Sequence, residues 1–301
     1  MDDCIIIGAG PAGLTAAIYL ARFHLSIRLF DCGSSRAALI PCTHNHAGYP
    51  AGVKGTELLR LMLEQAEKYG ATREQAEVTA ILPVEGGFEV HIGDRIVQAR
   101  TVLLATGVVN NRPKMDDAEH DAALERGLLR YCPICDGYEV TDKRVGVIGT
   151  GDHGMREAIF LRGYTSDVTL IAPGAAHELD DTCRAKLDDA GIVHVDGPCT
   201  PIQIAGDQIS VTTPGGMLEF DSIYPALGSV IRSKLAVAAG ANASEDGCLE
   251  VDEHQRTSIP GLFAAGDVVK GLDQISHAMG EAGVAATTIR NLLAEQRPIR
   301  R

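Results

Sequence analysis

The chain has 301 residues, 45% hydrophobic and 22% charged, which is typical of about two globular domains and argues against disorder. Its 40 acidic residues outnumber 27 basic ones and give a net charge of −13, which disfavours a nucleic-acid partner because phosphates are repelled. The acidic start lacks the basic residues of a secretory signal, and no apolar run approaches the ~18 residues of a membrane span. We therefore expect a cytoplasmic protein that contacts neither nucleic acid nor membrane.

The N-terminal segment has the pattern of a dinucleotide-binding unit. Apolar runs at 4–7 and 25–30 predict two strands, and residues 14–21 between them favour a helix. Glycines in the intervening turn permit a tight bend, let the backbone approach a pyrophosphate and bring helix and strand close together. An acid at the end of the second strand can accept hydrogen bonds from ribose hydroxyls. The predicted nucleotide-binding residues are Gly8, Gly10, Pro11, Ala12, Gly13 and Asp31.

A helix and several strands follow this unit. Apolar residues at helical spacing predict a helix over 55–70. Short strands are expected at 76–82, 87–92 and 96–105, and the last of them ends in Ala-Thr-Gly at residues 105–107.

The pattern of the first unit then returns later in the chain. Strands are expected at 144–148 and 168–172, with a helix to about residue 163 between them. A second glycine turn, formed by Gly149, Gly151 and Gly154, precedes that helix and predicts a second nucleotide site. Two units of this kind indicate an α/β fold with two Rossmann-like dinucleotide-binding domains.

Of the eight cysteines, Cys132 and Cys135 alone form a C-x-x-C pair. Zinc would need a second ligand pair; no other C-x-x-C exists, and the later histidines lack ligand spacing, so we expect no metal site. A pair of inert buried thiols is a further alternative. The spacing favours a redox role, because it lets the two sulfurs close a small disulfide ring, and a helix start there would lower the pKa of the leading thiol.

A buried strand near the C-terminus runs into Ala-Ala-Gly-Asp at residues 264–267. Together with the first glycine turn and the Ala-Thr-Gly at 105–107, it resembles the FAD-binding signatures of flavoproteins with two dinucleotide domains. With the C-x-x-C and its following Asp-Gly placed just before the second glycine turn, the whole chain resembles the low-molecular-weight thioredoxin reductases. The resemblance implies FAD as cofactor. The further FAD-binding residues that it implies are Asn45, Val78, Thr106, Gly107, Gly266, Asp267 and Gln274.

The resemblance also assigns roles to the residues of the C-x-x-C segment. Cys135 would face the flavin, Cys132 would exchange with an external disulfide or dithiol, and Asp136 would donate and accept the proton. The implied partner is a thioredoxin-like protein or a small dithiol or disulfide, and the implied assembly is a homodimer. The FAD domain would be discontinuous, formed by residues 1–112 and 245–301, and residues 113–244 would be inserted between its halves.

The chain departs from the family where members bind the 2′-phosphate of NADPH. These carry His-Arg-Arg and a further Arg after the second strand of the second unit. Here residues 172–178 are Ala-Pro-Gly-Ala-Ala-His-Glu, and no Arg or Lys occurs before Arg184. Such a loop is a poor host for a phosphate dianion, so we predict impaired NADPH binding.

The sequence leaves the electron donor open. NADPH, NADH, a ferredoxin or another flavin are the alternatives, and a dithiol oxidase would pass electrons from flavin to oxygen instead. The segment between Gly107 and Cys132 also differs from that of typical relatives, which puts docking of an ordinary thioredoxin in doubt. An FAD-bound redox sensor without catalytic turnover is the alternative from a different functional class.

Overall fold

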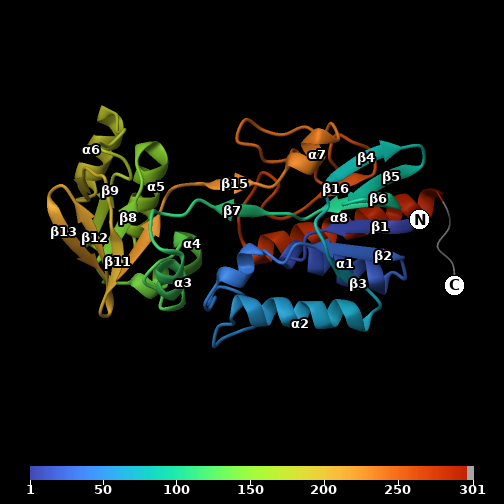
Figure 1. The fold of residues 1–301 in the computed structure, drawn as a ribbon, viewed down its shortest axis with the longest axis horizontal. Coiled ribbons are helices and arrows are strands. Elements are labelled where there is room, and N and C mark those ends of the chain that lie inside the picture. Colours follow the sequence, from blue (N-terminus) through green and yellow to red (C-terminus); the bar gives the residue numbers. More distant parts are fainter. Residues whose placement is uncertain (297–301) are drawn as a thin grey trace.

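The computed structural model describes residues 1–296, which fold into two lobes (Figure 1). The larger lobe contains both ends of the described chain, and the smaller lobe is formed by its middle part. The chain passes between the lobes in two strands, β7 (Val108–Asn110) and β15 (Ser229–Ile231), which pair antiparallel. The lobes are therefore joined by a single two-stranded ribbon.

The larger lobe is organised around a seven-stranded sheet in the order β3-β2-β1-β6-β5-β4, with β16 paired to β6. The pairs among β1, β2, β3, β6 and β16 are parallel, whereas β4, β5 and β6 form an antiparallel meander. The strands are β1 (Asp2–Ile7), β2 (Ile27–Asp31), β3 (Thr72–Gln75), β4 (Ala80–Val84), β5 (Gly87–Ile92), β6 (Arg95–Leu104) and β16 (Leu262–Ala264).

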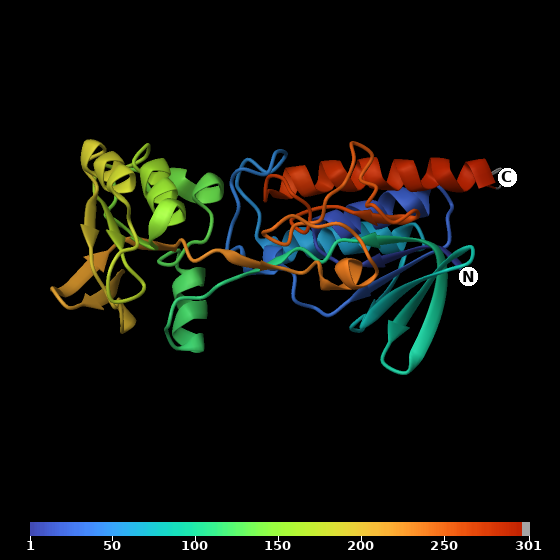
Figure 2. The same cartoon turned by 90° about the horizontal axis from the view of Figure 1, so that it is seen from above.

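Helices from both ends of the chain cover one face of this sheet. They are α1 (Pro11–Arg22), α2 (Gly55–Lys68) and α8 (Ile275–Gln296). Helix α8 packs along α1, as Figures 1 and 2 show, and its buried alanines allow the close approach. Burying such apolar surface contributes roughly 25 cal/mol per Å². The C-terminal helix thus completes the core that the N-terminal unit begins.

The smaller lobe contains a second, four-stranded parallel sheet in the order β10-β9-β8-β14. An antiparallel sheet of β11, β12 and β13 lies beside it. The strands are β8 (Val145–Ile148), β9 (Val168–Ile171), β10 (Val193–Val195), β11 (Ile202–Ala205), β12 (Gln208–Thr213), β13 (Gly216–Phe220) and β14 (Ser222–Pro225). The helices are α3 (Asp117–Glu125), α4 (Pro133–Asp136), α5 (Gly151–Leu161) and α6 (Asp181–Asp189).

The expected α/β fold with two Rossmann-like units is confirmed. The helix expected at 55–70 is α2, but the strand expected at 76–82 is wrong in part: residues 76–79 lie outside any strand and line a cavity, and β4 begins only at Ala80. Helix α7 (Lys234–Ala238) lies before the expected boundary at residue 244, yet Ala236 belongs to the core of the larger lobe. We therefore propose that the inserted domain ends at β15; its start near residue 113 stays a prediction.

Candidate active site

One cavity of about 910 Å³ lies where the larger lobe meets the C-x-x-C segment of the smaller lobe. Its lining comes from the first glycine turn, the ends of β2 and β6, the segment after β16 and both active-site cysteines. The predicted residues that line it are Gly8, Gly10, Pro11, Ala12, Asp31, Asn45, Val78, Thr106, Gly107, Cys132, Cys135, Asp136, Gly266, Asp267 and Gln274. Residues far apart in the sequence are thus brought to one site.

The glycines of the first turn differ in the space that surrounds them. A Cβ on Gly8 would lie 2.3 Å from the Ala105 carbonyl oxygen, and one on Gly13 would lie 1.8 Å from the Gly8 carbonyl oxygen. A Cβ on Gly10 would meet only the Ser35 hydroxyl, at 3.4 Å. Gly8 and Gly13 are therefore required by the protein itself, whereas Gly10 leaves space on the side of the cavity that a ligand can use.

The start of α1 suits an anionic group. The helix begins with Pro11 after the N-cap Gly10, and its first turn carries no acidic residue. Its free N–H groups and the positive end of its dipole therefore favour a phosphate or pyrophosphate. The cradle fits the pyrophosphate of FAD.

Asp31 lies at the end of β2 and is buried. Its carboxylate accepts hydrogen bonds from the N–H groups of Ala9 (3.2 Å) and Gly33 (3.1 Å) and pairs with Arg73 (2.8 Å). The expected ribose-binding acid is thus held rigidly at the cavity wall, beside the buried Val78.

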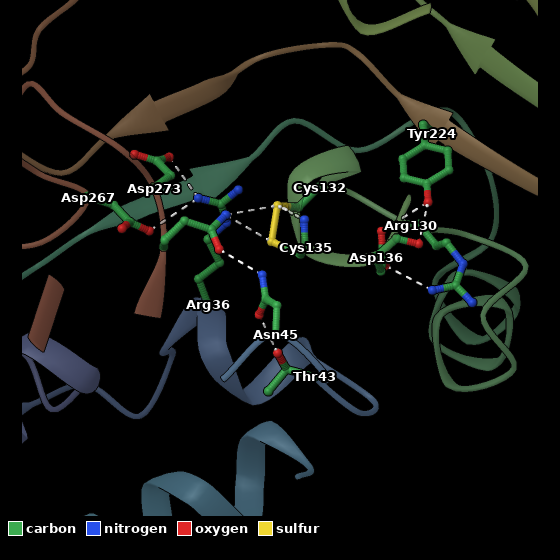
Figure 3. The surroundings of a disulfide bond; sticks show 11 residues. Arg36, Thr43, Asn45, Arg130, Cys132, Cys135, Asp136, Tyr224, Asp267 and Asp273 are labelled. Atoms are coloured by element: carbon green, nitrogen blue, oxygen red, sulfur yellow. Dashed lines mark hydrogen bonds and ion pairs between the residues drawn. A yellow bond between two sulfur atoms is a disulfide. The ribbon is translucent and has the colours of Figure 1, made fainter. Parts of the chain in front are cut away.

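A second acidic side chain, that of Asp267, also lines the cavity. Asp267 follows Gly266, whose φ of 80° is a backbone conformation that favours glycine. Burial and the neighbouring Asp273 raise the pKa of the Asp267 carboxyl group, and Arg36 opposes that rise. The Arg36 guanidinium donates to Asp267 (3.2 Å) and to Asp273 (2.8 Å), as Figure 3 shows. Sequence analysis missed Arg36, for which the local signal is only a cation shortly after Asp31.

The two predicted cysteines form a disulfide, Cys132–Cys135, at the start of the short helix α4. The Gln274 side-chain amide donates to the sulfur of Cys135 (3.2 Å) and lies 3.5 Å from that of Cys132. Asn45 donates to the Gln274 amide oxygen (3.0 Å) and accepts from the Thr43 hydroxyl (2.8 Å). A polar chain therefore links the larger lobe to the disulfide (Figure 3).

Asp136 follows the second cysteine, and its carboxylate lies between Arg130 and Tyr224 (Figure 3). Burial raises the pKa of its carboxyl group, and the neighbouring Arg130 opposes that rise. Arg130 donates to one carboxylate oxygen and the Tyr224 hydroxyl to the other, both at 2.9 Å. Sequence analysis assigned no role to Tyr224, which lies 88 residues from Asp136 along the chain, or to Arg130, which lies six residues before Asp136 but matches no motif.

The second glycine turn lies in the smaller lobe, and its glycines do not line the cavity. A Cβ on Gly154 would lie 2.8 Å from the Gly149 backbone, so these two glycines let β8 and α5 pack closely. The loop after β9 folds back onto this turn: the Glu178 N–H donates to the Thr150 hydroxyl at 2.6 Å, and the His177 ring lies 3.3 Å from it. The loop that would select a nucleotide is therefore tied to the glycine turn itself.

Within residues 1–296, no helix is long and apolar enough to cross a membrane. The same residues contain no group of three or more His, Cys, Asp or Glu side chains arranged to hold a metal ion.

Comparisons of the sequence and of the structure with known proteins point to the same family. Residues 2–282 match the pyridine nucleotide-disulphide oxidoreductase family. Thioredoxin reductase of Mycolicibacterium smegmatis is 32% identical, with 98% of each chain covered. The crystal structure of thioredoxin reductase from Streptococcus pyogenes superposes with a TM-score of 0.90 at 27% identity and covers 98% of this chain and 99% of that one.

A further solved structure, the atypical thioredoxin reductase TRi from Desulfovibrio vulgaris Hildenborough, is 30% identical. The match covers 99% of this chain and 100% of that one, with a TM-score of 0.56. The near-complete coverage and the disulfide in the cavity of the first glycine turn lead to one assignment. The chain belongs to the pyridine nucleotide-disulphide oxidoreductases, as a disulfide oxidoreductase of the low-molecular-weight thioredoxin reductase family.

Proposed function

We propose that this protein is an FAD-dependent thiol–disulfide oxidoreductase that passes electrons between FAD, the Cys132–Cys135 pair and an external disulfide. One observation carries the proposal: the disulfide lines the same cavity as the first glycine turn. Bound FAD would supply two-electron redox chemistry within reach of the sulfurs. The start of α1 would hold its pyrophosphate, Asp31 its adenosine ribose and Asp267 its ribitol.

The two sulfurs have different surroundings, which supports different roles. The Cys132 sulfur caps the N-terminus of α4, where it accepts a hydrogen bond from the Cys135 N–H at 3.2 Å. Such a position stabilises a thiolate. The Cys135 sulfur has the shorter contact to Gln274, a residue of the proposed flavin wall. We assign Cys132 to exchange with the substrate and Cys135 to contact with the flavin.

The exchange balances as follows when the enzyme pair is a dithiol. The Cys132 thiolate attacks one sulfur of the external disulfide and breaks its S–S bond, and solvent protonates the leaving thiolate. The Cys135 thiolate then attacks the Cys132 sulfur, which re-forms the Cys132–Cys135 disulfide, and the external thiolate released in this step takes a proton from the protonated Asp136. The external disulfide gains two electrons, and the enzyme dithiol loses them.

Single substitutions of the two cysteines test these roles. In the Cys132→Ser protein the remaining Cys135 thiolate should give a long-wavelength charge-transfer band with bound flavin, whereas Cys135→Ser should give none. The measurement is the visible absorbance spectrum of each flavoprotein after reduction of any mixed disulfides. Bands that occur the other way round would reverse the assignment.

Replacing Asp136 by Asn tests the proton transfer. The variant should fold and bind flavin normally, yet its turnover with a small disulfide should fall by roughly 10²-fold, the size of a lost general acid–base step. The control is the Asp121→Asn variant, which removes an exposed carboxylate of the same lobe. Turnover equal to that of the unmodified protein would remove Asp136 from the mechanism.

We propose that the electron donor is not NADPH bound in the usual way. This rests on the acidic loop after β9 and on its attachment to the second glycine turn through Thr150. NADH, a ferredoxin or another flavin are the alternative donors, and oxygen is the acceptor if the enzyme oxidises dithiols. Anaerobic treatment with dithiothreitol distinguishes these enzymes from a redox sensor without turnover. In an enzyme, the reduced Cys132–Cys135 pair should pass electrons to the flavin and bleach its absorbance, whereas a flavin that stays oxidised would favour the sensor.

The external partner is also a proposal. Relatives from many bacteria are named thioredoxin reductase, which supports a thioredoxin-like protein or a small disulfide or dithiol as substrate. A homodimer and a cytoplasmic location remain predictions. Sedimentation of the flavoprotein at several concentrations tests the first of these.

A further inference from the structure

The Asp136 carboxylate is held between two side chains that the exchange chemistry leaves without a role. The Arg130 guanidinium donates to Oδ2 and the Tyr224 hydroxyl to Oδ1, both at 2.9 Å. Arg130 precedes the C-x-x-C by two residues, and Tyr224 comes from β14. Figure 3 shows the carboxylate between these two groups, to the side of the disulfide.

These three side chains form a largely enclosed cluster. Tyr224 is fully buried, and the Arg130 and Asp136 side chains retain only 18% and 23% of their exposure. The guanidinium is itself fixed, because its Nε donates to the Gly127 carbonyl at 3.0 Å. In such an environment an ion pair is stronger than on an open surface. The carboxylate therefore has little freedom to turn.

The groups that face Asp136 have opposite effects on the ionisation of its carboxyl group. Arg130 favours its ionised form, and Glu139, on the following turn of the chain, disfavours it. The Tyr224 phenol remains neutral, because burial and the adjacent Asp136 raise its pKa well above the usual range. Burial of Asp136 acts in the same direction as Glu139. Arg130 is thus the cation of this cluster that favours the charged carboxylate, against burial and Glu139.

We propose that Arg130 and Tyr224 are positioning residues that fix the orientation and charge of Asp136 and so set the pH range in which the Cys132–Cys135 pair exchanges with a thiol. This inference rests on the proposed function of Asp136. When an external dithiol reduces the enzyme disulfide, the Asp136 carboxylate takes the proton of the attacking thiol. The new thiolate attacks the Cys132 sulfur, and Cys135 leaves as a thiolate.

The step completes without any further reactant. The second thiol of the external molecule loses its proton to solvent and attacks the external sulfur of the mixed disulfide, which releases Cys132. The external dithiol has become a disulfide and lost two electrons, and the enzyme pair has gained them. Only the first attack depends on the charge of Asp136, so its pH dependence reports on that charge.

The test uses the flavoprotein and dithiothreitol as the probe. Under anaerobic conditions, the initial rate at which dithiothreitol is oxidised by the enzyme is measured by quenched flow and chromatography from pH 5 to 9. Each rate is divided by that of the Asp136→Asn protein at the same pH, which removes the titration of dithiothreitol itself. The variants are Arg130→Met, Arg130→Lys and Tyr224→Phe, with flavin content and thermal unfolding as checks of folding.

In the unmodified protein this ratio should rise as Asp136 ionises. The midpoint should move up by about 1–3 pH units in Arg130→Met, because an opposite charge at contact lowers a carboxyl pKa by about that much. Arg130→Lys should restore most of the shift, and Tyr224→Phe should show a smaller upward shift. A purely structural role would lower the ratio equally at every pH.

Two outcomes would contradict the positioning role of Arg130 and Tyr224 and the proton-transfer role of Asp136 separately. If Arg130→Met and Tyr224→Phe keep the midpoint of the unmodified protein, the positioning role is wrong although Asp136 still acts. If the ratio is one at every pH in the unmodified protein, Asp136 has no part in the exchange, and the proposed mechanism itself fails at this residue.

Discussion

NADPH at micromolar concentration is expected to reduce the bound flavin slowly and with no clear preference over NADH. The 2′-phosphate carries about two negative charges, and each charge-assisted bond to an Arg contributes roughly 1.5–3 kcal/mol. Losing two such bonds weakens binding by roughly 10²–10⁴, at about 1.4 kcal/mol per factor of ten. The loop from Ala172 to Asp181 contains no Arg or Lys, and three acids follow His177 within it.

The measurement is anaerobic mixing of the flavoprotein with each nicotinamide, followed at the flavin absorbance. The exposed Ala175 and Ala176 are the places to restore cations, whereas Ala172 is fully buried and cannot accept a larger side chain. Replacing both exposed alanines by Arg should raise the preference for NADPH, and replacing both by Gln is the matched control. Rapid reduction of the unmodified flavin by micromolar NADPH would contradict the prediction.

Gly10→Val is expected to abolish flavin binding while the chain still folds. The added side chain has room in the protein itself, since only the Ser35 hydroxyl comes within 3.4 Å of the new Cβ and the N-cap has an ordinary extended conformation. It would instead occupy the space in which a pyrophosphate approaches the start of α1. The expected loss of flavin affinity is at least about 10³-fold, since the phosphates could no longer reach the backbone N–H groups.

Flavin content after reconstitution, measured by absorbance, checks this expectation. Gly280→Val is the matched control, because Gly280 lies on the exposed side of α8 with no atom near its added Cβ. Gly13→Val would be uninformative, since its Cβ collides with the backbone of Gly8 and damages the fold. A Gly10→Val protein that retains full flavin content would remove the first glycine turn from the cofactor site.

The two nucleotide-binding units were predictable because their signal is local. A strand, a glycine turn, a helix and a second strand follow one another within a short stretch, and the close contacts that a Cβ would make explain Gly8, Gly13, Gly149 and Gly154. The positions of Asp31 and of the C-x-x-C followed in the same way. Residues 76–79, part of the strand expected at 76–82, line the cavity instead of pairing.

Contacts between distant segments could not be predicted. Arg36 meets Asp267 and Asp273 across more than two hundred residues, and Tyr224 meets Asp136 across 88. Neither pair leaves a periodicity or a motif, because the fold alone brings the partners together. The hydrogen bond from the Glu178 N–H to the Thr150 hydroxyl could not be predicted either. The sequence shows that this loop lacks cations, but not that its backbone bonds to the second glycine turn.

The pairing of β16 and α8 with the N-terminal unit has a consequence for synthesis. Translation proceeds at roughly 5–20 residues per second, and domains generally fold as soon as their segments are available. The smaller lobe is contiguous and can close while the C-terminal elements are still being made. The larger lobe cannot, since Gly266, Asp267 and Gln274 arrive after β15 and the face of α1 stays uncovered until α8 follows. The FAD of the proposed function would therefore load only onto a nearly finished chain, and a nascent chain arrested after β15 would expose apolar surface that a chaperone could recognise.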